Sequence, residues 1–147
     1  MIASNVFFYQ VDISSSSQIS AAAAKIRATH GNPTVLINNA GISGHLQSII
    51  DTPEDTVRKV FEVNTISHFL TVKEFLPAMI ERNHGHVVTV ASMLSYFVLA
   101  NLTDYSCSKA SALAFHEGLA TELKNMYKAP NVRTTYAYTV PLVYIRC

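Results

Sequence analysis

A tyrosine and a lysine four residues apart, Tyr105 and Lys109, are the pair in this chain that most directly suggests chemistry. On a helix this spacing places both side chains on one face. A neighbouring ammonium favours the phenolate form of a tyrosine, so the pair could exchange a proton with an alcohol or a carbonyl group. Taken alone, the same pair is equally compatible with an ordinary contact on a helix surface.

Three other polar groups directly follow apolar runs that predict strands: Asp12, the segment Asn38-Asn39-Ala40-Gly41, and Ser92. Open parallel sheets bind ligands at the carboxyl ends of their strands, so these groups are predicted to converge on one site. Each also has a purely structural interpretation. Asp12 or Ser92 could cap the chain after a strand, and Asn38–Gly41 could form an ordinary turn.

The elements that must position these residues alternate along the chain. Runs of branched and aromatic residues predict strands at 5–11, 34–38, 86–91 and 132–138. Periodicity and end signals predict helices at about 16–29, 54–82 and 105–128. Capping boxes are predicted at Ser15 with Gln18 and at Thr52 with Asp55, and Pro77 is predicted to bend the second helix or to alter its final turn.

This order of strands and helices predicts the α/β class. The strands are almost continuously apolar, which is typical of a doubly wound parallel sheet with helices on both faces, a Rossmann-like three-layer α/β/α arrangement. The 147 residues are predicted to form a single domain, residues 1–147.

Composition excludes several classes of protein. With 49% hydrophobic and 14% charged residues the chain is not predicted to be disordered. Its net charge of +1 gives no excess of positive charge of the kind that binds nucleic acid. Two cysteines, Cys107 and Cys147, fit a reducing compartment. No signal peptide is predicted from the opening residues, and no apolar run in these residues is long enough to be predicted as a membrane span. We therefore expect a protein that is not secreted, and that is cytoplasmic or attached to a membrane through a segment absent from these residues.

No metal site is predicted. The histidines show no metal-binding spacing backed by cysteine or carboxylate partners; they are His30, His45, His68, His84, His86 and His116. Cys107 lies between Tyr105 and Lys109 but has no evident activating partner, so it is interpreted as a packed or bystander thiol.

Taken together, four motifs make the chain resemble the short-chain dehydrogenase/reductase family. They are Asn38-Asn39-Ala40-Gly41, Asn64 within Phe61-Glu62-Val63-Asn64, Ser92, and Tyr105-Ser106-Cys107-Ser108-Lys109. The resemblance covers about Asn5 to Tyr138. The sequences of residues 75–79 and 85–92 are most similar to the hydroxysteroid and retinol dehydrogenase branch of that family.

The resemblance implies an oxidoreductase that uses NAD(P). Tyr105 would be the general acid or base, Lys109 would support it and bind the nicotinamide ribose, Ser92 would orient the carbonyl, and Asn64 would hold a relay water. Asp12 and Ile13 would contact the adenine ring, and Asn38, Asn39, Ala40 and Gly41 would line the adenosine side. The implied substrate is a small-molecule alcohol or carbonyl compound such as a lipid, a steroid or a retinoid. The implied partner is a second copy, bound through helices 64–82 and 105–128.

The chain also departs from the family. It has no glycine-rich turn between a strand and a helix, and Pro141 is followed by Leu142 where a glycine is usual. We therefore expect a partial sheet that lacks the first two strands and the last strand, truncated at both ends, with weak cofactor binding. The strand at 5–11 would then pair beside 34–38 or stay unpaired. The alternative to an enzyme is a catalytically inactive fragment that acts, if at all, through its dimerisation helices.

Overall fold

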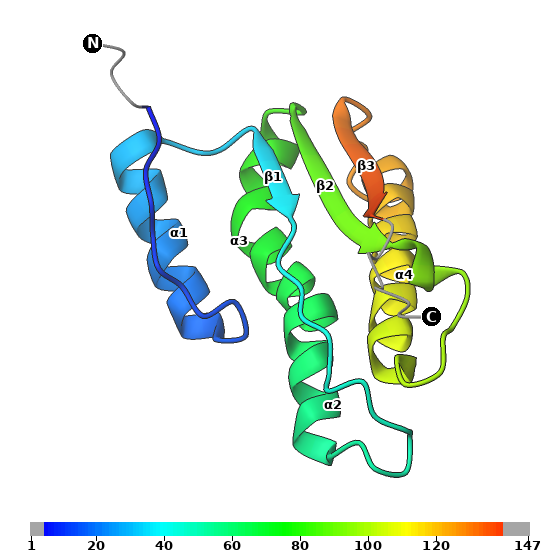
Figure 1. Cartoon of the computed structure of the whole chain (residues 1–147). Coiled ribbons are helices and arrows are strands. Elements are labelled where there is room, and N and C mark those ends of the chain that lie inside the picture. The colour runs from blue at the N-terminus through cyan, green and yellow to red at the C-terminus, as the bar shows by residue number, and fades with distance from the viewer. Residues whose placement is uncertain (1–4, 140–147) are drawn as a thin grey trace.

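The computed structural model describes residues 5–139, and these form a three-stranded parallel sheet with helices packed against it (Figure 1). In chain order the elements are α1 (Ser16–His30), β1 (Val35–Asn38), α2 (Glu54–Phe61), η1 (Glu62–Ile66), α3 (Ser67–Glu81), β2 (Gly85–Ser92), η2 (Met93–Ser95), α4 (Thr103–Asn125) and β3 (Val132–Thr139). The predicted α/β class is confirmed. The departures at Pro141 and Leu142, and Cys147, lie outside the described residues.

The sheet has the order β1-β2-β3 with all strands parallel, so their carboxyl ends lie at the same edge, where β2 and β3 end level and β1 ends three residues earlier. Asn38 lies opposite Thr89, and Ser92 lies opposite Thr139. The core fills the space between the sheet, α3 and α4, and is built from apolar side chains that include Val72, Leu76, Met79, Val87, Phe115, Leu119 and Val132. This packing fixes the two long helices that carry the candidate residues.

Helices cover only one face of the described sheet. Asn38 and Thr89 point toward α3 and α4, whereas Val35 and Ile37 point the other way and are 51% and 59% exposed. Between residues 5 and 139 the predicted second helical layer is therefore not seen. Crossovers of one hand that step along the sheet in one direction put their helices on one face, and a second layer requires the strand order to reverse.

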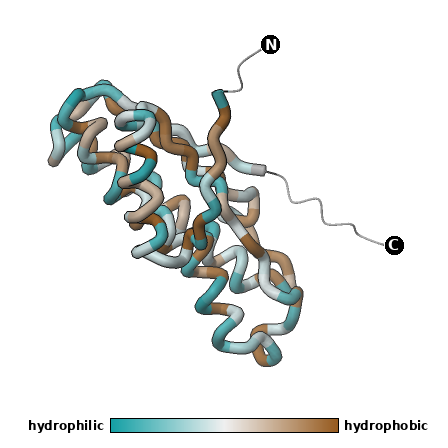
Figure 2. Tube along the Cα trace, turned by 90° about the vertical axis from the view of Figure 1, so that its left-hand side faces the viewer, coloured by the Kyte–Doolittle hydropathy of each residue, from teal (hydrophilic) through white to brown (hydrophobic). Residues whose placement is uncertain are grey.

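The predicted strand at 5–11 is wrong. This segment is not paired with β1 but runs along α1, where Tyr9 Oη lies 2.9 Å from His30 Nε2 and the Phe7 ring stacks near the His30 ring at 4.0 Å. It is hydrophobic in part (brown next to a teal first residue in Figure 2), and the Phe8 side chain is 88% exposed. Of the two expected outcomes, pairing beside β1 or staying unpaired, the structure shows the second, because propensity alone does not make a strand without pairing.

The helix predicted at 54–82 is divided by a wide π-helical turn, η1, between α2 and α3. The chain remains helical past Pro77 to Glu81, so the main irregularity lies upstream of the proline. No helix in the described part has both the length and the hydropathy needed to cross a membrane.

The two predicted capping boxes have different outcomes. Ser15 Oγ accepts a hydrogen bond from Gln18 N as predicted, but Gln18 Oε1 accepts one from Asp12 N rather than closing the box. The second box is wrong, because Thr52 Oγ1 donates to the carbonyl oxygen of Ser48 and leaves the start of α2 without a side-chain cap.

Candidate active site

Asn64 lies at the centre of the candidate site. It is fully buried in η1, and its amide makes three hydrogen bonds. Oδ1 accepts from Ile42 N at 2.8 Å, and Nδ2 donates to Ile42 O at 2.8 Å and to Ser108 Oγ at 2.9 Å. One side chain thus ties the loop that follows β1 to the first turns of α4.

Lys109 is buried beside Asn64. Its Nζ lies 5.7 Å from the centroid of the Tyr105 ring and donates a long, 3.4 Å hydrogen bond to Val90 O. A Cβ atom added to Gly41 would come within 3.0 Å of this Nζ and 3.5 Å of Asn64 Oδ1. The structure therefore brings Gly41, Asn64, Tyr105 and Lys109 together.

Burial lowers the pKa of Lys109, since the charged ammonium loses solvation. An ammonium carries three donors, so one long hydrogen bond to a carbonyl leaves donor capacity for an oxygen atom of a ligand. The donor capacity that remains is what a buried site needs to bind a hydroxyl group of a ligand.

Tyr105 lies in the first turn of α4, and its backbone carbonyl oxygen accepts a hydrogen bond from Ser108, a residue of the candidate site. Ser108 Oγ donates to Tyr105 O at 2.7 Å while accepting from Asn64 Nδ2. The predicted placement of Tyr105 and Lys109 on one helix face agrees with the structure, because the ammonium lies over the ring.

Ser92 lies at the carboxyl end of β2 and is fully buried. Its Oγ accepts a 3.2 Å hydrogen bond from Leu94 N and so caps η2. A hydroxyl that accepts such a bond keeps its own hydrogen, so Ser92 retains the ability to donate to a substrate oxygen. The structural and the chemical interpretations of this serine are therefore compatible.

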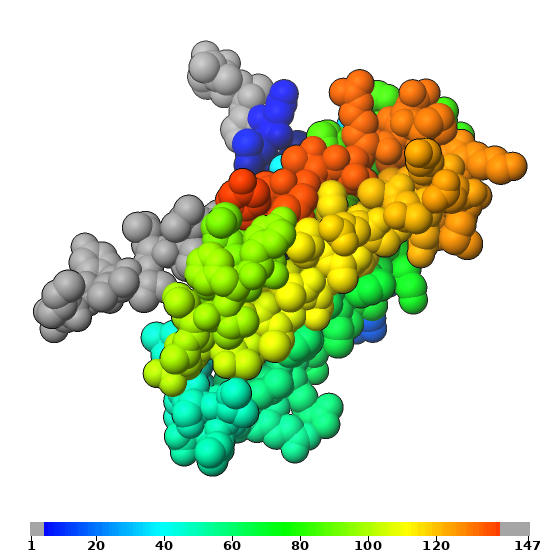
Figure 3. All heavy atoms as spheres, turned by 90° about the vertical axis from the view of Figure 1, so that its right-hand side faces the viewer, coloured from blue at the N-terminus to red at the C-terminus, as the bar shows by residue number. Residues whose placement is uncertain are grey.

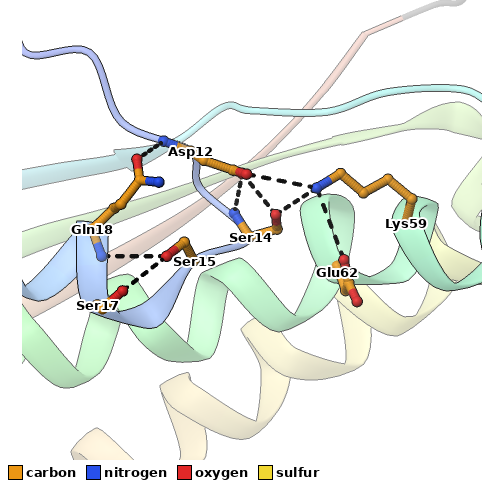
Figure 4. A network of polar contacts seen from close by, with 7 residues as sticks. All are labelled: Asp12, Ser14, Ser15, Ser17, Gln18, Lys59 and Glu62. Atoms are coloured by element: carbon orange, nitrogen blue, oxygen red, sulfur yellow. Dashed lines mark hydrogen bonds and ion pairs between the residues drawn. The ribbon is translucent and has the colours of Figure 1, made fainter.

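Asp12, expected on the adenosine side, contacts other residues at the surface (Figure 4). Its Oδ1 accepts from Ser14 N at 2.9 Å and from Ser14 Oγ at 2.6 Å, and its Oδ2 lies 3.8 Å from Lys59 Nζ. These Ser14 hydrogen bonds are the main reason that the pKa of Asp12 is lowered. Asp12 thus stays apart from the group around Lys109.

A cavity of about 220 Å³ lies beside the other residues expected on that side. Its lining includes Ile13, Asn38, Asn39, Ala40 and His68. Asn38 Oδ1 accepts from Thr71 Oγ1, but Asn38 Nδ2 has no hydrogen-bond partner in the described structure. Ile13 and Asn38–Ala40 are therefore brought to one cavity, next to Gly41 in sequence.

Sequence analysis missed His68, which is buried in this cavity with both ring nitrogens unpartnered in the described structure. Burial, and then the nearby charge of Lys109, lower the pKa of His68 to about 4. The signal that could have found it is its position four residues after Asn64, on the same helical face.

We expect His68 to make the folded chain sensitive to acid. The unfolded chain takes up the imidazole proton near pH 6.5 and the folded chain only near pH 4, so the unfolded state binds more protons between these values. Stability should thus fall as the pH drops through this range, by at most about 1.4 kcal/mol per pH unit from this group.

The measurement is urea unfolding at several pH values between 6.5 and 4, for the wild type and His68→Leu. The variant should lose less stability over this interval, whereas His45→Gln, at an exposed loop position, should keep the wild-type slope. His116, whose pKa burial also lowers, contributes equally in all three chains. Equal slopes for the wild type and His68→Leu would contradict the assignment.

Metal-binding and thiol chemistry find little support within residues 5–139. No three His, Cys, Asp or Glu side chains of this part group closely enough to hold a metal ion. Cys107 is exposed and lines a separate cavity with Phe61 and Asp104, so it is not part of the group around Lys109.

The family profile and several similar known proteins all point to dehydrogenases. The profile described as short chain dehydrogenase matches residues 1–138. The chain is 50% identical over 131 residues to dehydrogenase RED3 of Cochliobolus heterostrophus, covering 89% of this chain and 66% of that protein. It is 41% identical to human retinol dehydrogenase 10, covering 88% and 38%, and 40% identical to estradiol 17-beta-dehydrogenase 11 of Macaca fascicularis, covering 91% and 44%.

Solved structures agree with the fold. A metagenomic short-chain oxidoreductase in complex with NADP matches with a TM-score of 0.80 at 27% identity, over 87% of this chain and 56% of that one. NAD+-bound xylitol dehydrogenase matches with a TM-score of 0.82 at 27% identity, over 90% and 49%. The chain thus spans between about a third and two thirds of the length of the proteins that it resembles.

Proposed function

The chain belongs to the short-chain dehydrogenase family, and from this we propose that it provides the proton-transfer half of an NAD(P)-dependent oxidoreductase acting on an alcohol or carbonyl group. The observation that carries the proposal is the convergence of three side chains from two elements. Asn64 of η1 and the Tyr105–Lys109 pair of α4 meet beside Gly41, with the Lys109 ammonium buried.

Each of these residues has a distinct part in the proposal. Tyr105 gives or takes the proton of the substrate oxygen, and Ser92 donates a hydrogen bond to that oxygen. Lys109 offers its free donors to hydroxyl groups of the cofactor ribose, while Asn64 holds the loop at Ile42 and a water that feeds protons to Lys109. When bound, the cofactor supplies or accepts the hydride.

The residues present fit part of such a cofactor. The missing Cβ at Gly41 leaves room beside Lys109 Nζ, and the cavity beside Ile13 and Asn38–Ala40 suits an apolar, flat group such as an adenine ring. No segment of the 147 residues has the glycine-rich turn that binds a diphosphate at a helix N-terminus. The solved structures that hold NADP and NAD+ support this choice of cofactor.

For the substrate we propose a small alcohol or carbonyl compound with an apolar body, in the class of lipids, steroids and retinoids. The names of the relatives that act on retinol and estradiol support this class. So does the loop after η2, in which Phe97, Val98 and Leu99 expose apolar side chains close in sequence to Ser92.

Titration of NADH and NADPH tests the cofactor assignment. We expect the 147 residues by themselves to bind either cofactor with a dissociation constant above the millimolar range, because the diphosphate would meet no helix N-terminus built for it. A chimera in which a glycine-rich strand–turn–helix–strand unit from a family member precedes Met1 should bind at least about tenfold more tightly.

The control is the same chimera with Lys109→Met, which should bind less tightly than its parent. Sub-millimolar binding by the 147 residues would overturn the expected weakness. A chimera that binds no better than the 147 residues, and is indifferent to Lys109→Met, would contradict the proposed function.

We also propose that two copies pair through α3 and α4. These helices lie side by side (Figure 3), and between them runs a hollow of about 550 Å³ whose lining includes Phe69, Ala114, Phe115 and Gly118. Phe69 is 50% exposed there, although its ring packs against Phe115 at 4.7 Å. An apolar helix face of this kind suits the four-helix pairing expected from the family resemblance.

We expect Phe69→Glu to weaken this pairing by about 30-fold or more, since a charge would replace an aromatic anchor at the centre of the interface. Sedimentation equilibrium measures it. Phe97→Glu, at a similarly exposed phenylalanine outside the hollow, is the matched control and should leave association unchanged. A wild-type chain that stays monomeric at high concentration, or a Phe69→Glu variant that associates normally, would contradict the interface.

A further inference from the structure

A short chain of hydrogen bonds runs from β3 to the backbone of the candidate site. Tyr136 Oη donates to Ser95 Oγ at 2.8 Å, and Ser95 Oγ donates to the carbonyl oxygen of Lys109 at 3.0 Å. Ser95 is the last residue of η2, and η2 starts directly after Ser92. These two hydrogen bonds therefore connect β3, the turn that follows Ser92, and the helical turn that carries Tyr105 and Lys109.

The direction of this chain is fixed by the chemistry of its groups. A backbone carbonyl can only accept, so Ser95 must donate to Lys109 O and is left to accept from Tyr136. Burial raises the pKa of Tyr136, which keeps the proton that this arrangement needs. Hydrogen bonds aligned head to tail strengthen one another.

Neighbouring aromatic rings also pack against the Tyr136 side chain. Its ring lies 5.5 Å from the His116 ring and 6.5 Å from the Tyr96 ring, and His116 Nδ1 lies 3.3 Å from Thr89 Oγ1. The phenol therefore approaches Ser95 from a fixed direction. The loop at 96–101 is exposed, and its contacts with this region include the Tyr96 ring and the hydrogen bond from Tyr96 N to Met93 O.

We propose that Tyr136 is a positioning residue for the candidate active site: acting through Ser95, it sets how the turn that follows Ser92 lies against the Tyr105–Lys109 turn of α4. The inference rests on the proposed function, because it concerns the geometry between the substrate-orienting serine and the proton-transfer pair. Ser92 itself is coupled to the same turn through its hydrogen bond with Leu94 N.

Hydrogen exchange on the 147-residue chain is the first test, and it needs neither cofactor nor turnover. Tyr136→Phe removes only the hydroxyl, and Ser95→Ala removes both links. We expect amide exchange in η2 and in the first two turns of α4 to become about five- to tenfold faster in both variants. Exchange in α1 should not change, whereas a general loss of stability would speed it everywhere.

Two controls sharpen this result. Tyr138→Phe removes the hydroxyl of the tyrosine two residues further along β3, which is 57% exposed, and should leave exchange at its wild-type rate. Ser95→Thr keeps a hydroxyl and should restore most of the protection. Unchanged or uniformly faster exchange in Tyr136→Phe would overturn the proposal.

Turnover in the chimera described above is the second test. Tyr136→Phe should lower kcat by about fivefold without changing the KM of the cofactor or the shape of the pH profile. Locally faster exchange with an unchanged kcat would refute a positioning role. A chimera without any turnover would instead count against the proposed function, and the exchange pattern would then decide the role of Tyr136 alone.

Discussion

Replacing Tyr105 by phenylalanine is expected to lower kcat by about 10²- to 10⁴-fold, the range attributed to a positioned acid or base. The measurement is the rate of alcohol oxidation and of carbonyl reduction in the chimera that carries a glycine-rich unit. The change keeps the ring near Lys109 Nζ and leaves the backbone of α4, held through Ser108, intact. It removes only the hydroxyl that exchanges the proton.

The cofactor titration separates this effect from a loss of structure. Tyr105→Phe should bind NADH within about threefold of its parent, because the Lys109 donors and the space at Gly41 remain. Tyr96→Phe, which removes the hydroxyl of an exposed tyrosine in the loop after η2, serves as the matched control and should retain turnover. Unaltered turnover in Tyr105→Phe would refute the proton-transfer role.

The parts of this site that could be predicted from sequence are those fixed by local geometry. Tyr105 and Lys109 share a helix face because their spacing is four residues, and that holds wherever the helix lies. Ser92 and Asn38 could be assigned to strand ends because their strands are continuous apolar runs. In a parallel sheet those ends lie at one edge, which is enough to expect a site there.

Features that depend on contacts distant in sequence could not be predicted in this way. The 5–11 segment has strand propensity, but it does not pair with the open edge of β1 and lies along α1 instead. The helical layer on the second face was expected from the almost continuously apolar strands, while the described crossovers all step in one direction.

The π-helical turn η1 also escaped prediction. Glu62–Ile66 shows the same apolar spacing as an α-helix, and nothing in its composition signals a wider turn. The expected irregularity was assigned to Pro77, because a missing N–H is visible in sequence and a wider turn is not. Similarly, Ser95 and Tyr136 are unremarkable residue types whose connection exists only once β3 lies next to β2.

Asn64 lies in the π-helical turn and makes contacts that are distant in sequence. Its replacement by alanine is expected to lower the free energy of unfolding by about 3–5 kcal/mol. Urea denaturation of the 147-residue chain measures this loss. The amide is fully buried and makes all three of its hydrogen bonds across elements, two to Ile42 and one to Ser108. Removing it leaves the part-buried N–H and carbonyl oxygen of Ile42 and the buried Ser108 Oγ without the partner that Asn64 provides.

Asn39→Ala is the matched control, since this asparagine is exposed on the same loop and its loss should change stability by no more than about 0.5 kcal/mol. Asn64→Asp gives a second comparison: it keeps an acceptor for Ile42 N, but it turns an oxygen toward Ile42 O in place of a donor. The new carboxylate and the Ile42 carbonyl oxygen would repel each other. The Asn64→Asp variant should therefore lose less stability than Asn64→Ala only if the nearby Lys109 ammonium offsets this repulsion. A loss below about 1 kcal/mol for Asn64→Ala would mean that the loop and α4 are held together without Asn64. The π-helical turn would then be incidental to the site, whereas a full loss makes it the structural reason that Gly41, Tyr105 and Lys109 meet.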